Sequence, residues 1–134
     1  MPARIIIHSL EQARGALAAA QQSGSSVTLE SAPGAGGYAG PAWFKLLVEE
    51  ARREFPAAEC EAWLDCGDEA GTVLAALRLG LKRIRFSGSD AALIRLGPVA
   101  RELGAVLESR PAEAAFDLAR TKASEAMCRR HLAK

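Results

Sequence analysis

The sequence has almost no net charge. Its 134 residues include 17 lysines and arginines and 16 aspartates and glutamates, which gives a formal net charge of +1 at pH 7. A charge this small produces no field across the molecule that would attract nucleic acid or an anionic membrane surface, so such a partner would need a local basic patch. The tail has a basic cluster of Arg129, Arg130, His131 and Lys134, but it is short and is better explained as a solvated helix end. We therefore expect no nucleic-acid partner and no membrane partner.

Cysteine is scarce. The chain has three cysteines, Cys60, Cys66 and Cys128, and neither their number nor their spacing fits a zinc site. Cys60 and Cys66 lie on one predicted strand and its exit, which separates them by about 20 Å and excludes a disulfide between them. A reducing compartment is the simplest interpretation.

Long apolar segments are missing as well. The N-terminal stretch MPARIIIHSLEQ has only a short apolar run before Glu11, and no other run is long enough to cross a bilayer. These features predict a cytoplasmic protein. The phosphate-binding pattern GxxxxGK[ST] is also absent.

The sequence does contain a regular alternation of strand-like and helix-like runs. Because single helices separate the strands, the strands are expected to pair in parallel through right-handed crossovers. This pattern predicts an α/β fold: residues 1–110 form one domain of about five βα units, and residues 111–134 form a C-terminal helix that packs on it or extends from it. The expected strands are residues 4–8, 26–30, 59–65, 83–86 and 105–108, and the expected helices are residues 10–22, 41–55, 69–79, 90–103 (with a kink or break near Gly97, caused by Pro98) and 111–132.

The strands leave two architectures open. Several of them alternate apolar and polar residues, as in the strand that carries Trp63 and Asp65 and in the next one, which carries Arg83 and Arg85. Such alternation favours a sheet with helices on one side, an open half-barrel with a polar inner face. The alternative is a flavodoxin-like sheet with helices on both sides. A one-sided sheet would expose Trp63, and a homodimer would cover it.

Polar residues follow every predicted strand. In parallel α/β sheets, ligands bind at the carboxyl ends of the strands, where helix N-termini present free backbone N–H groups. The same residue types also cap helices and fill turns, so each position has a structural interpretation too. The candidate catalytic residues are His8, Glu30, Asp65 and Cys66, and the candidate ligand-binding residues are Gly36, Gly37, Tyr38, Gly67, Asp68 and Ser87; no metal ligand is predicted and the cofactor is unknown.

The stretch SAPGAGGYAGP, residues 31–41, is dense in glycine. It is either a mobile lid over the strand ends or a flexible connector. Cys66 also has two interpretations. It precedes a predicted helix, whose dipole favours a thiolate, and it is equally a small buried side chain.

The stretch LDCGDEAG, residues 64–71, resembles the first motif of S-adenosylmethionine-dependent methyltransferases. Asp65, Gly67 and Gly71 match the acid, the first glycine and the last glycine of that motif, and Glu69 stands in place of the middle glycine. Asp90 lies roughly where the family has a second acid. The resemblance covers residues 64–90 and implies a site for S-adenosylmethionine.

These patterns support two main functional hypotheses. The first is a protein, enzyme or not, that binds a small polar ligand at the carboxyl ends of its strands. The second is a non-catalytic homodimeric interaction or regulatory protein, in which the same polar residues form salt bridges. Binding of S-adenosylmethionine is a minor third hypothesis.

Overall fold

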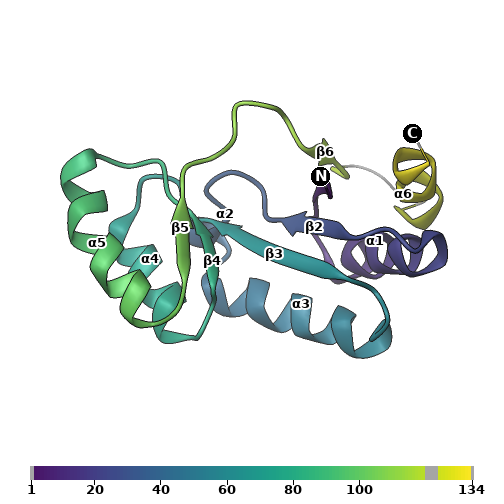
Figure 1. Cartoon of the computed structure of the whole chain (residues 1–134), viewed down its shortest axis with the longest axis horizontal. Coiled ribbons are helices and arrows are strands. Elements are labelled where there is room, and N and C mark those ends of the chain that lie inside the picture. Colours follow the sequence, from purple (N-terminus) through teal and green to yellow (C-terminus); the bar gives the residue numbers. More distant parts are fainter. Residues whose placement is uncertain (1, 120–123, 134) are drawn as a thin grey trace. The chain divides into compact units, whose positions relative to one another are not determined.

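The computed structural model describes residues 2–119 and 124–133. Its strands form a parallel sheet in the order β5-β4-β3-β2-β1-β6 (Figure 1), and the expected parallel α/β fold is confirmed. Both architectures that the sequence left open belong to this class. The strands are β1 (Ala3–Ile6), β2 (Val27–Glu30), β3 (Cys60–Asp65), β4 (Arg83–Arg85), β5 (Val106–Glu108) and β6 (Phe116–Asp117), and the helices are α1 (Leu10–Ser23), α2 (Ala35–Tyr38), α3 (Pro41–Glu54), α4 (Ala70–Arg78), α5 (Asp90–Glu102) and α6 (Ser124–Leu132).

The first five strands and the helices α1, α3, α4 and α5 lie where the sequence places them, to within two residues at each end, whereas the short helix α2 was not expected. Local signals account for this agreement. Ser9 and Ser89 accept hydrogen bonds from the first turns of α1 and α5, and Gly24 ends α1 in a left-handed conformation with a φ of 69°. Helix α5 continues through Pro98, so the break that the sequence suggested there is not present.

The helix expected over residues 111–132 is wrong in its first part. Phe116 and Asp117 form strand β6 beside β1, and α6 begins only at Ser124. Residues 120–123 of the expected helix lie outside the described residues. The physical reason is that Leu118 is buried and β6 continues the pairing of β1, a long-range contact that helical periodicity does not reveal.

The chain divides into two compact units, and we describe each by itself. Unit 1 contains residues 1–30, 46–62 and 114–134; unit 2 contains residues 31–45 and 63–113. Whether residues 1–110 form one domain stays a prediction. No helix in the described part of the chain is both long enough and apolar enough to cross a membrane.

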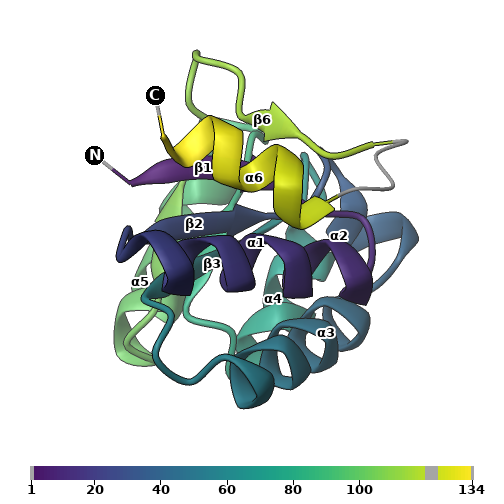
Figure 2. The same ribbon diagram turned by 90° about the vertical axis from the view of Figure 1, so that its right-hand side faces the viewer.

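In unit 1, β1 lies between β2 and β6 and pairs in parallel with both. Helix α1 buries a row of small and branched apolar residues in the core of this unit, and α6 runs beside α1 (Figure 2). Gly15 permits this contact, because a Cβ at that position would lie 2.6 Å from the Cβ of Ser124. The core residues of unit 1 are Ile5, Ile7, Ala13, Ala16, Leu17, Ala19, Ala20, Val27, Leu29, Leu47, Val48, Ala51, Leu118 and Cys128.

In unit 2, β4 pairs in parallel with β3 and with β5. Because both crossovers step in the same direction and such crossovers are right-handed, α4 and α5 cover the same face of these strands (Figure 1). The apolar residues on this face include Leu64, Ile84 and Phe86, which are fully buried. The opposite face carries Trp63, Asp65 and Arg85, as the alternation along the strands predicts.

Trp63 is not exposed on this polar face. The side chain is 7% exposed, and the guanidinium carbon of Arg85 lies 3.8 Å from the centre of its ring. Arg85 also pairs with Glu108 at 3.2 Å. Arg85 therefore covers the Trp63 ring through a cation–π contact and is itself paired with Glu108. Because Trp63 is not exposed, it gives no reason to expect a homodimer.

Candidate functional site

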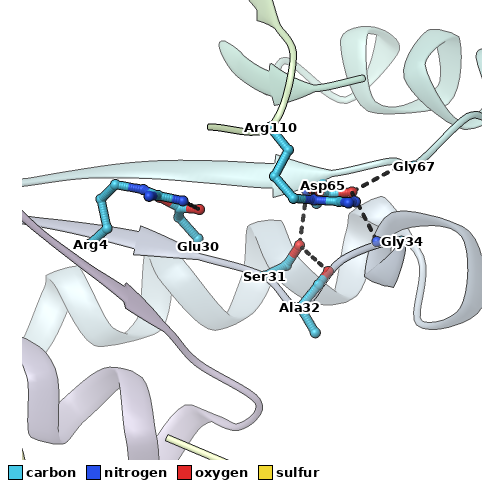
Figure 3. Close-up of polar contacts among 8 residues, drawn as sticks. All are labelled: Arg4, Glu30, Ser31, Ala32, Gly34, Asp65, Gly67 and Arg110. Carbon is cyan, nitrogen blue, oxygen red and sulfur yellow. Dashed lines mark hydrogen bonds and ion pairs between the residues drawn. The ribbon is translucent and has the colours of Figure 1, made fainter. Parts of the chain in front are cut away.

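Asp65, at the carboxyl end of β3, is the centre of a polar network in unit 2 (Figure 3). Its Oδ1 accepts hydrogen bonds from the backbone N–H groups of Gly34 and Gly67, both at 2.9 Å. Arg110 binds the same carboxylate through two nitrogens, Nε to Oδ2 at 2.8 Å and Nη2 to Oδ1 at 2.9 Å. The Asp65 backbone N–H donates to Oγ of Ser31 at 2.9 Å. We call these five residues the Asp65–Arg110 site.

The carboxylate of Asp65 is held in its charged form. Burial raises its pKa, but the hydrogen bonds from Arg110, Gly34 and Gly67 oppose this effect, and the net result is a lowered pKa. A carboxylate that accepts four hydrogen bonds has little capacity left to take a proton from a ligand. The geometry therefore favours a positioning role for Asp65, which ties together the 31–34 segment, the turn at Gly67 and Arg110.

Arg110 differs from Asp65 in its exposure. The Asp65 side chain is 5% exposed, whereas that of Arg110 is 40% exposed. A guanidinium has five N–H donors, and two of those on Arg110 are used by Asp65. The others make no hydrogen bond within residues 2–119 and 124–133. Asp65 thus holds the guanidinium in one orientation while leaving donors open to solvent.

The glycine-rich segment after β2 is not an extended loop. Residues 35–38 form the short helix α2, which packs against α4. A Cβ at Gly36 would lie 3.0 Å from Sγ of Cys66 and 3.1 Å from the backbone oxygen of Asp65, and a Cβ at Gly37 would lie 2.4 Å from Oε2 of Glu69. These glycines permit close packing of α2 on the 65–69 turn. Tyr38 points away from this packing and is 73% exposed.

Cys66 is buried directly after Asp65. Burial raises the pKa of its thiol to about 12, and the negative charges of Asp65 and Glu69 act in the same direction. The thiol is therefore neutral at physiological pH, and a neutral thiol is a poor nucleophile. The structure gives no support to a catalytic thiolate at this position.

The remaining candidates in unit 2 surround the turn after β3. Gly67 has a φ of 58°, a left-handed conformation that favours glycine, and its backbone oxygen accepts a hydrogen bond from the N–H of Ser87 at 2.7 Å. The carboxyl ends of β3 and β4 are thus joined. Asp68 and Ser87 are exposed at this edge.

Glu30 and His8 lie in unit 1, and each has its own partner. Glu30, at the end of β2, is buried and forms an ion pair with Arg4 of β1 through two hydrogen bonds, Nε to Oε2 at 2.5 Å and Nη2 to Oε1 at 3.1 Å (Figure 3). His8, just beyond β1, places Nε2 2.6 Å from Oδ1 of Asp117, which ends β6. The carboxylate beside His8 in unit 1 is therefore that of Asp117, which was not among the candidate residues.

The end of β1 and the segment after β6 are fixed by Gln12, which is buried in the first turn of α1. Its Oε1 accepts the backbone N–H of His8 at 2.7 Å, and its Nε2 donates to the backbone oxygen of Leu118 at 2.6 Å. The backbone N–H of Ala119 also donates to Oδ1 of Asp117 at 2.9 Å. One buried amide therefore positions the two segments that carry His8 and Asp117.

Several residues in these networks are not among the predicted candidates, and the most important are Arg110 and Asp117. Arg110 follows β5, so the rule that polar residues at strand ends converge was sufficient to find it. Asp117 had no such signal, because its segment was assigned to a helix.

The structure does not suggest a metal site. Among the described residues, no three or more histidine, cysteine, aspartate or glutamate side chains are placed to hold a metal ion. Comparison with known proteins adds no assignment: no family model matches the chain, and a search of curated proteins finds no match.

Proposed function

We propose that this protein binds a small polar ligand carrying an anionic group at the carboxyl ends of the strands in unit 2, with Arg110 contacting the anion. The observation that carries the proposal is the half-exposed guanidinium of Arg110, whose orientation is fixed by the buried carboxylate of Asp65. A planar guanidinium with free N–H donors is well suited to a carboxylate or phosphate. Prior orientation reduces the entropic cost of binding.

The surroundings of Arg110 fit this role. Asp65 neutralises the arginine without competing for the ligand, because all its hydrogen bonds are made within unit 2. Exposed polar groups lie at the same ends of β3 and β4, including the hydroxyl of Ser87 and the side chain of Asp68. These two groups supply a donor and an acceptor for the neutral part of a polar ligand.

A thermal-shift screen tests this proposal. The compounds are inorganic phosphate, nucleotides, sugar phosphates, small carboxylates, S-adenosylmethionine and metal ions. A ligand at 100 times its dissociation constant stabilises the native state by about 2.7 kcal/mol, which is readily detected. We expect hits among the phosphates or carboxylates, and we expect Arg110→Gln to abolish them.

The matched control is Arg101→Gln, which removes an exposed arginine from α5 in the same unit. Arg101→Gln removes one positive charge, as Arg110→Gln does, but it should leave the thermal shifts caused by the ligands unchanged. No shift with any anionic compound, or hits that persist in Arg110→Gln, would reject the proposal.

Homodimerisation is the second candidate function, and one observation favours it. Val99 on α5 is 36% exposed and lines a groove of about 330 Å³ between α4 and α5. We propose a second copy of the chain as the occupant under this hypothesis. Light scattering should then report a dimer that Val99→Glu converts to monomer, and a wild-type monomer at high micromolar concentration would exclude it. The groove is lined by Ala70, Leu74, Ala92, Arg95, Leu96 and Val99.

S-adenosylmethionine has less support as the ligand. In unit 2, Gly36 and Gly37 of α2 pack directly on the turn that resembles the methyltransferase motif, and Glu69 is hydrogen-bonded to Thr72 at 2.9 Å. Protein atoms therefore occupy space that the motif would leave for the ligand. The same screen includes this compound.

A further inference from the structure

A second group of residues, in unit 1, has the geometry of a proton-transfer site. His8 follows β1 and Asp117 ends β6, and these strands pair in parallel with Ile6 opposite Asp117. Their carboxyl ends thus bring an imidazole and a carboxylate to 2.6 Å. This group is separate from the Asp65–Arg110 site and shares no residue with it.

The pair is held in place by groups that are not themselves reactive. The buried Gln12 side chain hydrogen-bonds the backbone of His8 on one side and that of Leu118 on the other. Oδ1 of Asp117 receives a second hydrogen bond, from the backbone N–H of Ala119. A carboxylate that orients an imidazole, and is itself fixed by hydrogen bonds, is the arrangement by which histidine bases are positioned.

The hydrogen bond decides which nitrogen of His8 is basic. An ionised Asp117 only accepts hydrogen bonds, so Nε2 of the neutral imidazole carries the proton and Nδ1 keeps its lone pair. Nδ1 makes no hydrogen bond within the described residues. The His8 and Asp117 side chains are 33% and 48% exposed, so a ligand can reach them.

We propose that His8 and Asp117 form a general-base pair that activates a water molecule for attack on the acyl carbon of a small ester. Nδ1 of His8 takes a proton from the water as the water oxygen bonds to the carbonyl carbon, and the carbonyl electron pair moves onto its oxygen. When the tetrahedral intermediate collapses, the alkoxide leaves and regains a proton from the imidazolium. Asp117 stabilises the imidazolium through Nε2–H and keeps its own charge.

Helix α1 holds the segment that carries His8. The helix begins at Leu10, two residues after His8, and the side chain of Gln12 in its first turn accepts the backbone N–H of His8. Cys66 is no competing nucleophile, because its thiol is buried in unit 2.

Hydrolysis of p-nitrophenyl acetate tests the proposal with the full chain. The wild type should hydrolyse it faster than buffer alone, with a normal solvent deuterium isotope effect that marks proton transfer. His8→Gln should reduce the enzymatic rate by about 100-fold or more. Asp117→Asn should lower kcat and leave KM nearly unchanged, since Asp117 is a positioning residue. The controls are His131→Gln, which removes the other histidine, and Glu54→Gln, which removes a carboxylate from the exposed pair with Arg14.

Nitrogen NMR of the two histidines provides a second readout that does not depend on activity. Neutral His8 should be the Nε2–H tautomer in the wild type and a mixture in Asp117→Asn. This reading of the wild type stays informative if Asp117→Asn fails to fold. An Nδ1–H tautomer at His8, a wild-type rate equal to that of buffer or of His8→Gln, or an absent isotope effect would overturn the proposal. Ligand binding by Arg110 in the thermal-shift screen is unaffected by any of these outcomes.

Discussion

At the scale of single residues, Asp65 shows how much surrounding structure one buried charge requires. Burying a carboxylate carries a desolvation penalty, and the hydrogen bonds that Asp65 accepts from Arg110 and two backbone N–H groups offset it. These partners come from three separate segments of unit 2. Loss of the carboxylate would therefore leave several donors without an acceptor at once.

Asp65→Ala should lower the free energy of unfolding by about 2–4 kcal/mol, because it removes the buried partner of the ion pair with Arg110 and leaves the N–H groups of Gly34 and Gly67 unpaired. Urea unfolding measures the change. Glu54→Ala is the control, since it breaks an ion pair with Arg14 whose two side chains are both well exposed. Its effect should be far smaller. Equal losses in the two variants would contradict a special role for Asp65.

The contribution of Asp65 should depend on pH in a definite direction. Its pKa is lower in the native state than in the unfolded chain, so its stabilising effect is complete above the unfolded pKa and is lost as pH falls through the native pKa. We expect the difference in unfolding free energy between the wild type and Asp65→Asn to narrow from about pH 5 to pH 3. Urea titrations at several pH values measure it. A difference that stays constant would show that the native pKa is not lowered.

The sequence led to Asp65 but not to its partner. Alternation along β3 and β4 places Asp65 and Arg85 on one face, and the two residues are opposite each other in the register of these strands. In the structure Asp65 binds Arg110, and Arg85 binds Glu108 and covers Trp63. The strand periodicity predicts which side chains share a face, whereas the course of the chain after β5 decides which of them meet.

At the scale of elements, the glycines of the 34–40 segment show why a glycine-rich sequence need not be a mobile loop. Gly36 and Gly37 allow α2 to approach the turn after β3 more closely than any side chain would permit. Composition alone could not distinguish this packing role from flexibility, because both favour glycine. The packing of α2 does not support the interpretation of residues 31–41 as a mobile lid, which stays a prediction.

Gly36→Ala tests this packing role. The added Cβ would lie 3.1 Å from the backbone oxygen of Asp65, which cannot move freely, and we expect a loss of about 1–3 kcal/mol in the free energy of unfolding. The matched control is Gly71→Ala in α4, where a Cβ meets no atom within 4 Å. This change should stabilise the protein by about 0.5 kcal/mol, since alanine favours a helix. Thermal or urea unfolding measures both, and a neutral Gly36→Ala would indicate that the segment is loosely packed.

At the scale of the whole molecule, neither compact unit is one continuous segment. Unit 1 is built from three stretches of chain and unit 2 from two, and two of the four boundaries between them fall inside α3 and β3. This division could not be predicted from the sequence, which contains no linker and continues its alternation of helices and strands through the boundaries. Unfolding one unit alone would require breaking a helix and a strand in their middle.

We therefore expect a single cooperative unfolding transition. Both tryptophans, Trp43 and Trp63, belong to unit 2, so tryptophan fluorescence reports on that unit, whereas far-UV circular dichroism reports on the helices of both. In a urea titration the two signals should change together. A fluorescence transition displaced from the circular dichroism transition would show that the units unfold separately.

The pairing of β6 with β1 has a consequence for synthesis of the protein. Strand β1 meets β2 early in translation, but its other edge is filled by Phe116 and Asp117, more than a hundred residues later. Until then, the nascent chain carries an open strand edge, the kind of surface that templates pairing between chains. Any truncation before residue 116 would make this exposure permanent. Chaperone dependence and inclusion-body formation should therefore increase sharply for chains that end just short of β6.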